Sequence, residues 1–186
     1  MSKSVLISIQ PKWCNLIAKG VKTVEIRKSR PKFETPFKVY IYCTKGKKKL
    51  LDVMLDGNEI YGEIYHGDPV FIKGFPERFY NKNYECGNGK IIGEFICDKI
   101  YRYSTSDALK EECEISDIKA VELSCIPKSK ISNYEYSAEG KENCIMLIGL
   151  YLWHISDLVI YDTPKELSEF GKSKPPQSWC YVDKGE

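Results

Sequence analysis

The distribution of apolar residues along the 186-residue chain predicts many short strands and a few helices. Apolar runs of strand length recur between turns, at residues 4–9, 38–44, 90–101 and 158–161. Residues 11–19 instead predict a helix, because Pro11 is tolerated in a first turn and Gly20 is well placed to end the segment. The mixture predicts an α+β fold around a small antiparallel β-barrel with flanking helices.

Residues 20–27, with the sequence Gly-Val-Lys-Thr-Val-Glu-Ile-Arg, predict a strand with two chemically different faces. Side chains alternate between the faces of a strand, so Val24 and Ile26 point together toward a core. The polar residues that gather on or near the opposite face are Lys22, Thr23, Glu25 and Arg27. Any half-exposed strand with a surface ion pair shows the same alternation, so the pattern alone does not separate a site from a solvated surface.

The remaining segments carry weaker signals. Residues 46–90 are predicted to be an elaboration on the barrel that binds a ligand, forms a lid or does neither. The other expected elements are an acidic helical segment at 106–118, a loop at 131–136, a short helix at 137–143, a helix starting at Thr163, and a terminal run at 178–182 that packs against the body.

Length and composition predict a single domain formed by residues 1–186. No apolar run is long enough to cross a bilayer and the N-terminus does not look like a signal peptide, so we expect a cytoplasmic protein without a membrane partner. The eight cysteines lack Cys-x-x-Cys spacing and the only histidines are His66 and His154, so we expect reduced thiols and no metal. Nucleotide-cofactor motifs are absent from the sequence, so we expect no cofactor.

The net charge of +2 conceals an uneven distribution along the chain. Residues 1–50 contain 13 basic and two acidic residues, whereas the remaining chain contains 15 basic and 24 acidic residues. A polarised surface with a positive face is typical of phosphate binding. The alternative is that acidic residues from later segments fold back and neutralise the basic first part.

The charged strand resembles the signature of a known family. The pattern G-x-K-x-x-E-x-R after a short helix, here from Gly20 to Arg27, resembles that of the ASCH family, a branch of the PUA-like folds. Residues 8–11 are similar to the start of family members, and residues 175–182 resemble a recurring ending of phage and bacterial members. With the segment near residues 153–155, the resemblance spans most of the chain. It implies a barrel in which the strand with Gly93 and Phe95 pairs with the motif strand.

The resemblance also implies a function. Family members resemble RNA-binding modules, and the cleft around the motif is expected to hold nucleotide-like ligands. One branch hydrolyses N4-acetylcytidine with a threonine nucleophile two residues before the arginine and with the lysine as its activator. Lys22 and Arg27 match that branch, but Glu25 stands where its threonine would be, so the chain departs from the amidohydrolase pattern. Some members are ribonucleases, which keeps hydrolysis open.

The predicted site combines the motif strand, the basic turn after it and three tryptophans. We expect basic side chains to grip phosphate or a base edge, Glu25 to accept from a base amine, and a tryptophan ring to stack on a base. The candidate contacts are Lys22, Thr23, Glu25, Arg27, Lys28, Arg30, Trp13, Trp153 and Trp179. If the protein is an enzyme, Lys22 and Glu25 are the candidate catalytic residues, because partial desolvation beside Arg27 would lower the pKa of the lysine.

Three functions stay open at this point. The first is an ASCH domain that binds RNA or a modified nucleotide. The second is a nucleoside amidohydrolase or ribonuclease-type hydrolase that uses the same cleft. The third is a protein-interaction module of the coregulator kind, which the acidic later part of the chain favours. His154, with Ser156 beside it, is either a general acid or base or a partner in a structural hydrogen bond.

Overall fold

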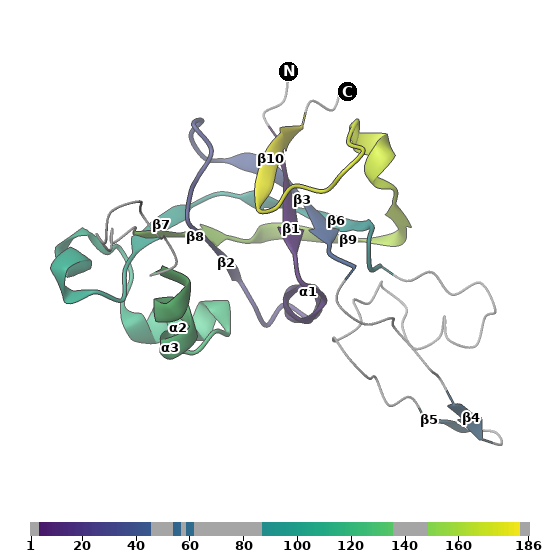
Figure 1. The fold of residues 1–186 in the computed structure, drawn as a ribbon, viewed down its shortest axis with the longest axis horizontal. Coiled ribbons are helices and arrows are strands. Elements are labelled where there is room, and N and C mark those ends of the chain that lie inside the picture. The colour runs from purple at the N-terminus through teal and green to yellow at the C-terminus, as the bar shows by residue number, and fades with distance from the viewer. Residues whose placement is uncertain (1–3, 46–53, 57–58, 62–86, 136–148, 183–186) are drawn as a thin grey trace, which may run out of the picture. The chain divides into compact units, whose positions relative to one another are not determined.

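The computed structural model in Figure 1 describes residues 4–45, 54–56, 59–61, 87–135 and 149–182. These residues fall into two compact units, which are described separately. The first comprises Met1–Gly20, Phe37–Phe95 and Asp157–Glu186, and the second comprises Val21–Pro36 and Ile96–Ser156. Most of the predicted elaboration at 46–90 lies outside the described residues, apart from residues 87–90 and the antiparallel pair β4 (Met54–Asp56) and β5 (Glu59–Tyr61).

The first unit is built on a five-stranded sheet of mostly apolar strands. The strand order is β10 (Trp179–Val182), β1 (Ser4–Ile9), β3 (Phe37–Cys43), β6 (Ile91–Cys97) and β9 (Ser156–Lys165). β1 pairs in parallel with β3 and antiparallel with β10, and it is buried along its whole length. A near-continuous apolar run is typical of such a doubly covered strand. The pairing of Ser4 with Val182 confirms that the terminal run packs against the body.

Helix α1 (Pro11–Ala18) connects β1 to the motif, as the sequence predicts. Pro11 occupies the first turn, where its missing N–H costs no hydrogen bond. The chain leaves the helix through Gly20, whose φ of 71° lies in the left-handed region that glycine adopts without strain. The helix therefore ends where the motif begins.

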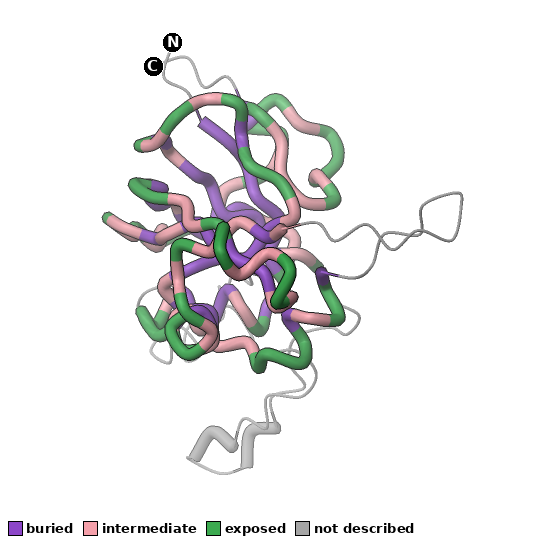
Figure 2. The backbone as a smooth tube through the Cα atoms, turned by 90° about the vertical axis from the view of Figure 1, so that its left-hand side faces the viewer, coloured by how far each residue is buried: buried purple, intermediate pink, exposed green. Residues whose placement is uncertain are grey.

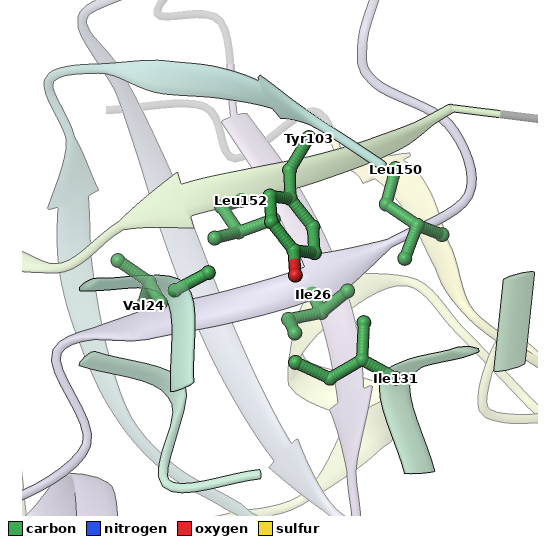
Figure 3. Packing of buried hydrophobic residues seen from close by; sticks show 7 residues of the cluster. Val24, Ile26, Tyr103, Ile131, Leu150 and Leu152 are labelled. Carbon is green, nitrogen blue, oxygen red and sulfur yellow. The ribbon is translucent and has the colours of Figure 1, made fainter. Parts of the chain in front are cut away.

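The second unit holds the motif strand in a three-stranded antiparallel sheet. The strand order is β2 (Val24–Arg27), β8 (Leu150–His154) and β7 (Ile100–Tyr103). The 3-10 helix η2 (Asp107–Glu112) and the helices α2 (Asp117–Ser124) and α3 (Lys128–Glu135) follow β7. Figure 3 shows Ile131 of α3 facing Val24, Ile26, Tyr103, Leu150 and Leu152 of the sheet in one buried cluster.

The fold class agrees with the prediction of an α+β protein. Among the described residues the strands form sheets of five, three and two strands rather than one closed barrel. Figure 2 colours the described residues by burial; β1 and β2 are buried along their whole length, whereas β9 is mostly intermediate or exposed. In the described part of the chain, no helix is long and apolar enough to cross a membrane.

The strand predicted at 90–101 is two strands. β6 ends at Cys97 in the five-stranded sheet, and β7 begins at Ile100 in the three-stranded sheet. At the break, the Asp98 carboxylate lies 2.7 Å from Nδ1 of His154, and the backbone N–H of His154 donates to the carbonyl of Lys99. The prediction of one strand was wrong because apolar spacing does not reveal a change of pairing partner.

The pairing implied for the strand with Gly93 and Phe95 was also wrong. Its neighbours are β3 and β9, whereas the motif strand pairs with β8. The close approach of β9 explains the glycine, because a Cβ on Gly93 would lie 2.3 Å from the carbonyl oxygen of Val159. Gly93 therefore serves strand packing in the first unit.

Two further predicted elements need correction. Residues 131–135, predicted as loop, belong to α3. Ile131 of this helix is buried in the core cluster of the second unit. The helix predicted from Thr163 does not form there, since β9 continues to Lys165 and η3 (Leu167–Phe170) starts after Glu166. Glu166 and Glu169 form a reciprocal capping box at this later start. The short helix predicted at 137–143 lies outside the described residues.

Candidate functional site

The motif strand β2 shows the predicted alternation of faces. Val24 and Ile26 are buried in the core cluster under α2 and α3. Lys22, Glu25 and Arg27 lie outside this cluster and are only 1%, 6% and 9% exposed. The reading of these charges as a solvated surface pair therefore does not hold. The motif places charged groups inside the protein, where they need close partners.

Glu25 links the two basic residues of the motif. Its Oε2 lies 3.3 Å from Nζ of Lys22, and its Oε1 lies 3.2 Å from Nη2 of Arg27. One carboxylate thus contacts an ammonium and a guanidinium with different oxygens. Because all three side chains are nearly buried, their attraction is screened less by water than that of a surface pair. The spacing of the motif produces this arrangement directly.

The C-terminal end of α2 holds the start of the motif. Nζ of Lys22 donates to the carbonyl of Ser124 at 2.9 Å, and the backbone N–H of Thr23 donates to the carbonyl of Leu123 at 2.9 Å. The negative end of a helix dipole is a favourable place for a cation. Cys125 ends α2 in the left-handed conformation with φ 58°. The sequence gives no signal for this contact, because any residue type supplies a backbone carbonyl.

Burial lowers the pKa of Lys22 below its ordinary value. Desolvation is the largest cause, since it penalises the ammonium form. The negative charge of Glu25 opposes this lowering of the Lys22 pKa, and the positive charge of Arg27 adds to it. The lowered pKa agrees in direction with the expectation from the sequence. A lysine of this kind gives up its proton more readily than a surface lysine.

Two side-chain oxygens of the motif are buried without a hydrogen bond among the described residues. They are Oγ1 of Thr23 and Oε2 of Glu25. The latter oxygen is close to Lys22, as given above, but the contact lacks hydrogen-bond geometry. Buried polar atoms usually have a partner, and each exception calls for an explanation such as a missing ligand or water.

The three tryptophans differ in their relation to the motif. Trp153 pairs directly with Glu25 across β8 and β2, but it is completely buried, so its ring has no open face for stacking in this structure. Trp13 and Trp179 are half-buried and belong to the other compact unit. The Trp179 ring packs edge-on against Tyr181, with centroids 5.4 Å apart. Within the unit that holds the motif, Trp153 is the tryptophan that lies next to the motif strand.

The basic turn after the motif makes contacts of its own. Nζ of Lys28 lies 4.8 Å from the ring centroid of Tyr134 on α3. Arg30 is exposed, and its Nη2 lies 3.6 Å from a carboxylate oxygen of Glu34. Tyr134 is a neighbour that the sequence analysis missed, because residues 131–136 were expected to form a loop. A helical interpretation of residues 128–135 would have predicted an ordered position for Tyr134.

His154 is oriented by an acidic partner rather than by its neighbour in sequence. Its Nδ1 lies 2.7 Å from the Asp98 carboxylate, while the Ser156 hydroxyl donates to the carbonyl of Ile96 at 2.9 Å. Burial would raise the pKa of Asp98, but the hydrogen bond from His154 outweighs it and the pKa is lowered. His154 lies directly opposite Val24, so it is adjacent to the motif strand.

No group of three or more His, Cys, Asp or Glu residues in the described part of the chain could hold a metal ion. The motif itself supplies an amine, a hydroxyl, a carboxylate and a guanidinium. These groups can donate to phosphate and base oxygens and accept from base amines.

Comparison with known proteins identifies the family. Residues 7–154 match the family model of the ASCH domain. The chain belongs to the ASCH domain family. This membership confirms the resemblance seen in the motif, and it indicates a PUA-like domain of the nucleic-acid-binding kind. No curated protein matches the ASCH chain.

Solved structures support the same fold. The crystal structure of ASCH from Zymomonas mobilis has a TM-score of 0.57 and 15% sequence identity, covering 98% of this chain and 89% of that one. A tyrosine-to-phenylalanine mutant of the same protein matches with a TM-score of 0.50 and 16% identity, over 98% and 92% of the two chains. At this identity the likeness concerns the ASCH fold alone.

Proposed function

We propose that this ASCH domain binds RNA or a modified nucleotide at the motif strand. The observation that carries the proposal is the pair of buried oxygens, Thr23 Oγ1 and Glu25 Oε2, that lack a hydrogen bond among the described residues and lie in the same motif as the basic groups of Lys22 and Arg27. Leaving a buried polar group unsatisfied costs about 1–3 kcal/mol, which a ligand with matching groups would recover. A nucleotide offers such groups, because it combines base amines with an anionic phosphate.

Each motif residue has a distinct part in this proposal. The Glu25 carboxylate accepts a hydrogen bond from a base amine, and the Thr23 hydroxyl bonds the neighbouring base edge. Arg27 and Lys22 favour the anionic phosphate, with Lys28 and Arg30 adding charge in the following turn. Lys22, Glu25 and Arg27 are nearly buried. A ligand therefore reaches their side chains only when the side chains that cover them move.

RNA binding by isosteric variants of the motif tests the proposal. We expect fluorescence anisotropy to show that wild-type protein binds labelled single-stranded RNA of about 12 nucleotides, with affinity falling between roughly 50 and 200 mM salt. Glu25→Gln and Thr23→Val keep the side-chain shape but change hydrogen bonding. We expect each variant to bind the preferred homopolymer with about tenfold lower affinity than the wild type does. The four homopolymers should then differ less in affinity.

The control for these variants is Glu122→Gln. Glu122 is an exposed glutamate of α2 that pairs with Lys119, so this variant makes the same change of charge away from the motif. It should bind all four homopolymers as the wild type does. Retention of the wild-type base preference by both motif variants would rule out the motif as the reading site. Absence of salt-sensitive RNA binding by the wild type would favour free modified nucleosides or a protein partner.

One observation favours hydrolysis as a second function. The lowered pKa of Lys22, next to the carboxylate of Glu25, gives the site an amine that can accept a proton from water or a hydroxyl. Lys22→Met keeps the length of the side chain and removes the base. If the protein hydrolyses RNA or an acylated nucleoside, chromatography should show product with wild type and none with Lys22→Met, while RNA binding by Lys22→Met is weakened but stays measurable. Equal product from both proteins would exclude Lys22 as the base.

A further inference from the structure

One exposed face of α3 carries a basic and an aromatic side chain one turn apart. Lys130 and Tyr134 are separated by four residues, which places them on the same side of a helix. Lys130 is exposed, and Tyr134 is 38% exposed although it is a large ring. Nζ of Lys28, the residue that follows the motif strand, lies 4.8 Å from the Tyr134 ring centroid. This face of α3 is thus continuous with the end of the motif.

Basic residues follow the motif along the chain, and one of them, Lys28, lies against the Tyr134 ring. Lys28, Arg30 and Lys32 belong to the turn after the motif, and Lys130 adds a fourth cation from α3. The exposed acid in this group is Glu34, which pairs with Arg30. Glu135 of α3 is completely buried and receives hydrogen bonds from Ser104 and Thr105, so its carboxylate does not lie on the exposed face of the helix.

The other lysine at the start of α3 has a different role. Lys128 pairs with Asp117 at 2.6 Å on α2, which ties the two helices together. Lys130 itself is exposed, and among the described residues no carboxylate lies within 4.0 Å of its ammonium group. An exposed ring flanked by cations is the pattern that binds single-stranded nucleic acid, because a base stacks on the ring while phosphates meet the cations.

We propose that Lys28, Lys130 and Tyr134, here called the α3 face, bind the strand of RNA that continues from a nucleotide held at the motif. This inference rests on the proposed function and specifies its ligand as single-stranded RNA of several nucleotides rather than a free nucleotide. Tyr134 stacks one base, Lys130 meets a neighbouring phosphate, and Lys28 connects the α3 face to the motif. The buried motif then reads one base, and the exposed face supplies affinity for the chain on either side of it.

A double variant of the α3 face, Lys130→Gln with Tyr134→Ser, tests this ligand class. We expect it to weaken binding of a labelled RNA of about 12 nucleotides by at least tenfold and to reduce the salt slope by about one unit. Competition by single nucleoside 5′-monophosphates against the wild-type and variant proteins should give unchanged inhibition constants. That difference separates the α3 face from the motif, where Glu25→Gln affects both kinds of ligand.

The matched control is Lys119→Gln with Tyr181→Ser. Lys119 is an exposed lysine of α2, and Tyr181 is 43% exposed, so the control makes the same substitutions at similar exposure elsewhere. Circular dichroism and thermal melting would show that both double variants are folded. Equal affinity of the test and control variants for the 12-nucleotide RNA would overturn the inference, as would an equal loss of mononucleotide binding. Failure of the wild type to bind any RNA would overturn the proposed function itself.

Photo-cross-linking gives a readout that does not depend on variants. RNA carrying 4-thiouridine should cross-link to the tryptic peptide that begins at Ile131 and contains Tyr134, as detected by mass spectrometry. An excess of unlabelled RNA should suppress the cross-link. Cross-links confined to peptides outside α3 and the motif would contradict the α3 face.

Discussion

The motif owes its chemistry to the burial of individual residues. A lysine in the protein interior is costly unless acceptors surround it. Lys22 meets this requirement with the carboxylate of Glu25 and the carbonyl of Ser124. The remaining cost appears as the lowered pKa. A surface lysine in the same motif would hold a permanent charge and could bind phosphate but would act poorly as a base.

The lowered pKa of Lys22 predicts a specific pH dependence of stability. Between the folded and unfolded pKa values the unfolded chain binds more protons, so the free energy of unfolding gained from this residue rises as pH increases toward about 10. Lys22→Met lacks the titrating group. We expect urea unfolding at several pH values from about 7 to 10 to show the wild type gaining stability relative to Lys22→Met as pH rises.

Taking the difference between the two proteins removes the contribution of the tyrosines. Burial raises the pKa of Tyr40, Tyr42, Tyr103 and Tyr161, which lowers stability with rising pH in both proteins alike. A stability difference that stays constant across the range would show that Lys22 has an ordinary pKa in the folded protein.

Gly93 illustrates a residue fixed by a close backbone contact. A methyl group there would lie 2.3 Å from the Val159 carbonyl oxygen, so β6 and β9 would have to move apart. We expect Gly93→Ala to lower the free energy of unfolding by about 1–3 kcal/mol in urea titrations. Gly149→Ala is the control, since its nearest contacts at 3.9 Å are ordinary, and it should change stability by less than about 0.5 kcal/mol. Equal stability of the two variants would contradict the close contact.

At the level of elements, Asp117 joins several parts of the second unit. Lys128 of α3 and the hydroxyl of Tyr103 on β7 donate to it at 2.6 and 3.0 Å, and Lys110 of η2 also donates. Ser116 caps α2 through the N–H of Lys119. Burial would raise the pKa of Asp117, but these hydrogen bonds lower it to about 2. The network holds α2 and α3 in place, and α2 in turn holds Lys22.

The Asp117 network predicts a loss of stability in acid. Because the folded pKa lies below the unfolded value, the carboxylate stabilises the fold above about pH 4 and this effect fades as pH falls toward about 2. We expect Asp117→Asn to be less stable than wild type by about 1 kcal/mol at neutral pH, after allowance for solvent screening. Urea titrations near pH 6 and pH 3 should show the difference shrinking in acid. A difference that is the same at both pH values would show that the ionised carboxylate is not the stabilising form.

At the level of the whole molecule, the chain alternates between the two compact units. It changes unit at residues 20, 36, 95 and 156, and the ASCH match at 7–154 includes parts of both. Neither unit is a continuous stretch of sequence. A unit assembled from separated segments depends on the other unit to bring those segments together, so we propose that residues 1–186 form one domain.

This organisation predicts a single cooperative unfolding transition. Differential scanning calorimetry should show one peak whose calorimetric and van't Hoff enthalpies agree. Circular dichroism and tryptophan fluorescence should report the same midpoint, since Trp153 lies in one unit and Trp13 and Trp179 in the other. Two resolved transitions would show that the units fold independently.

The uneven charge along the chain is partly balanced by pairing within the units. Lys38 of the basic first part lies 2.7 Å from Glu94, which comes from the acidic remainder. This is the neutralisation that the sequence analysis offered as an alternative to a polarised surface. In the turn after the motif, the Lys28 side chain contacts an aromatic ring and Arg30 pairs with Glu34 of the same segment.

The sequence by itself determined the features that depend on local periodicity. The alternation in residues 24–27 separates Val24 and Ile26 from Glu25 and Arg27, because the side-chain period of a strand is two wherever the strand pairs. The proline and glycine around α1 fix its ends for equally local reasons. The spacing of Lys22, Glu25 and Arg27 also allows one carboxylate to contact both cations.

Only the tertiary structure decided the features that depend on partners distant in sequence. The break between β6 and β7, the pairing of Glu25 with Trp153, and the carbonyl of Ser124 beside Lys22 all join segments that lie far apart along the chain. Burial is the sum of such contacts, so no local pattern fixes it. The motif strand was recognisable in the sequence, but its burial, and with it the lowered pKa of Lys22, follows from the segments that fold around it.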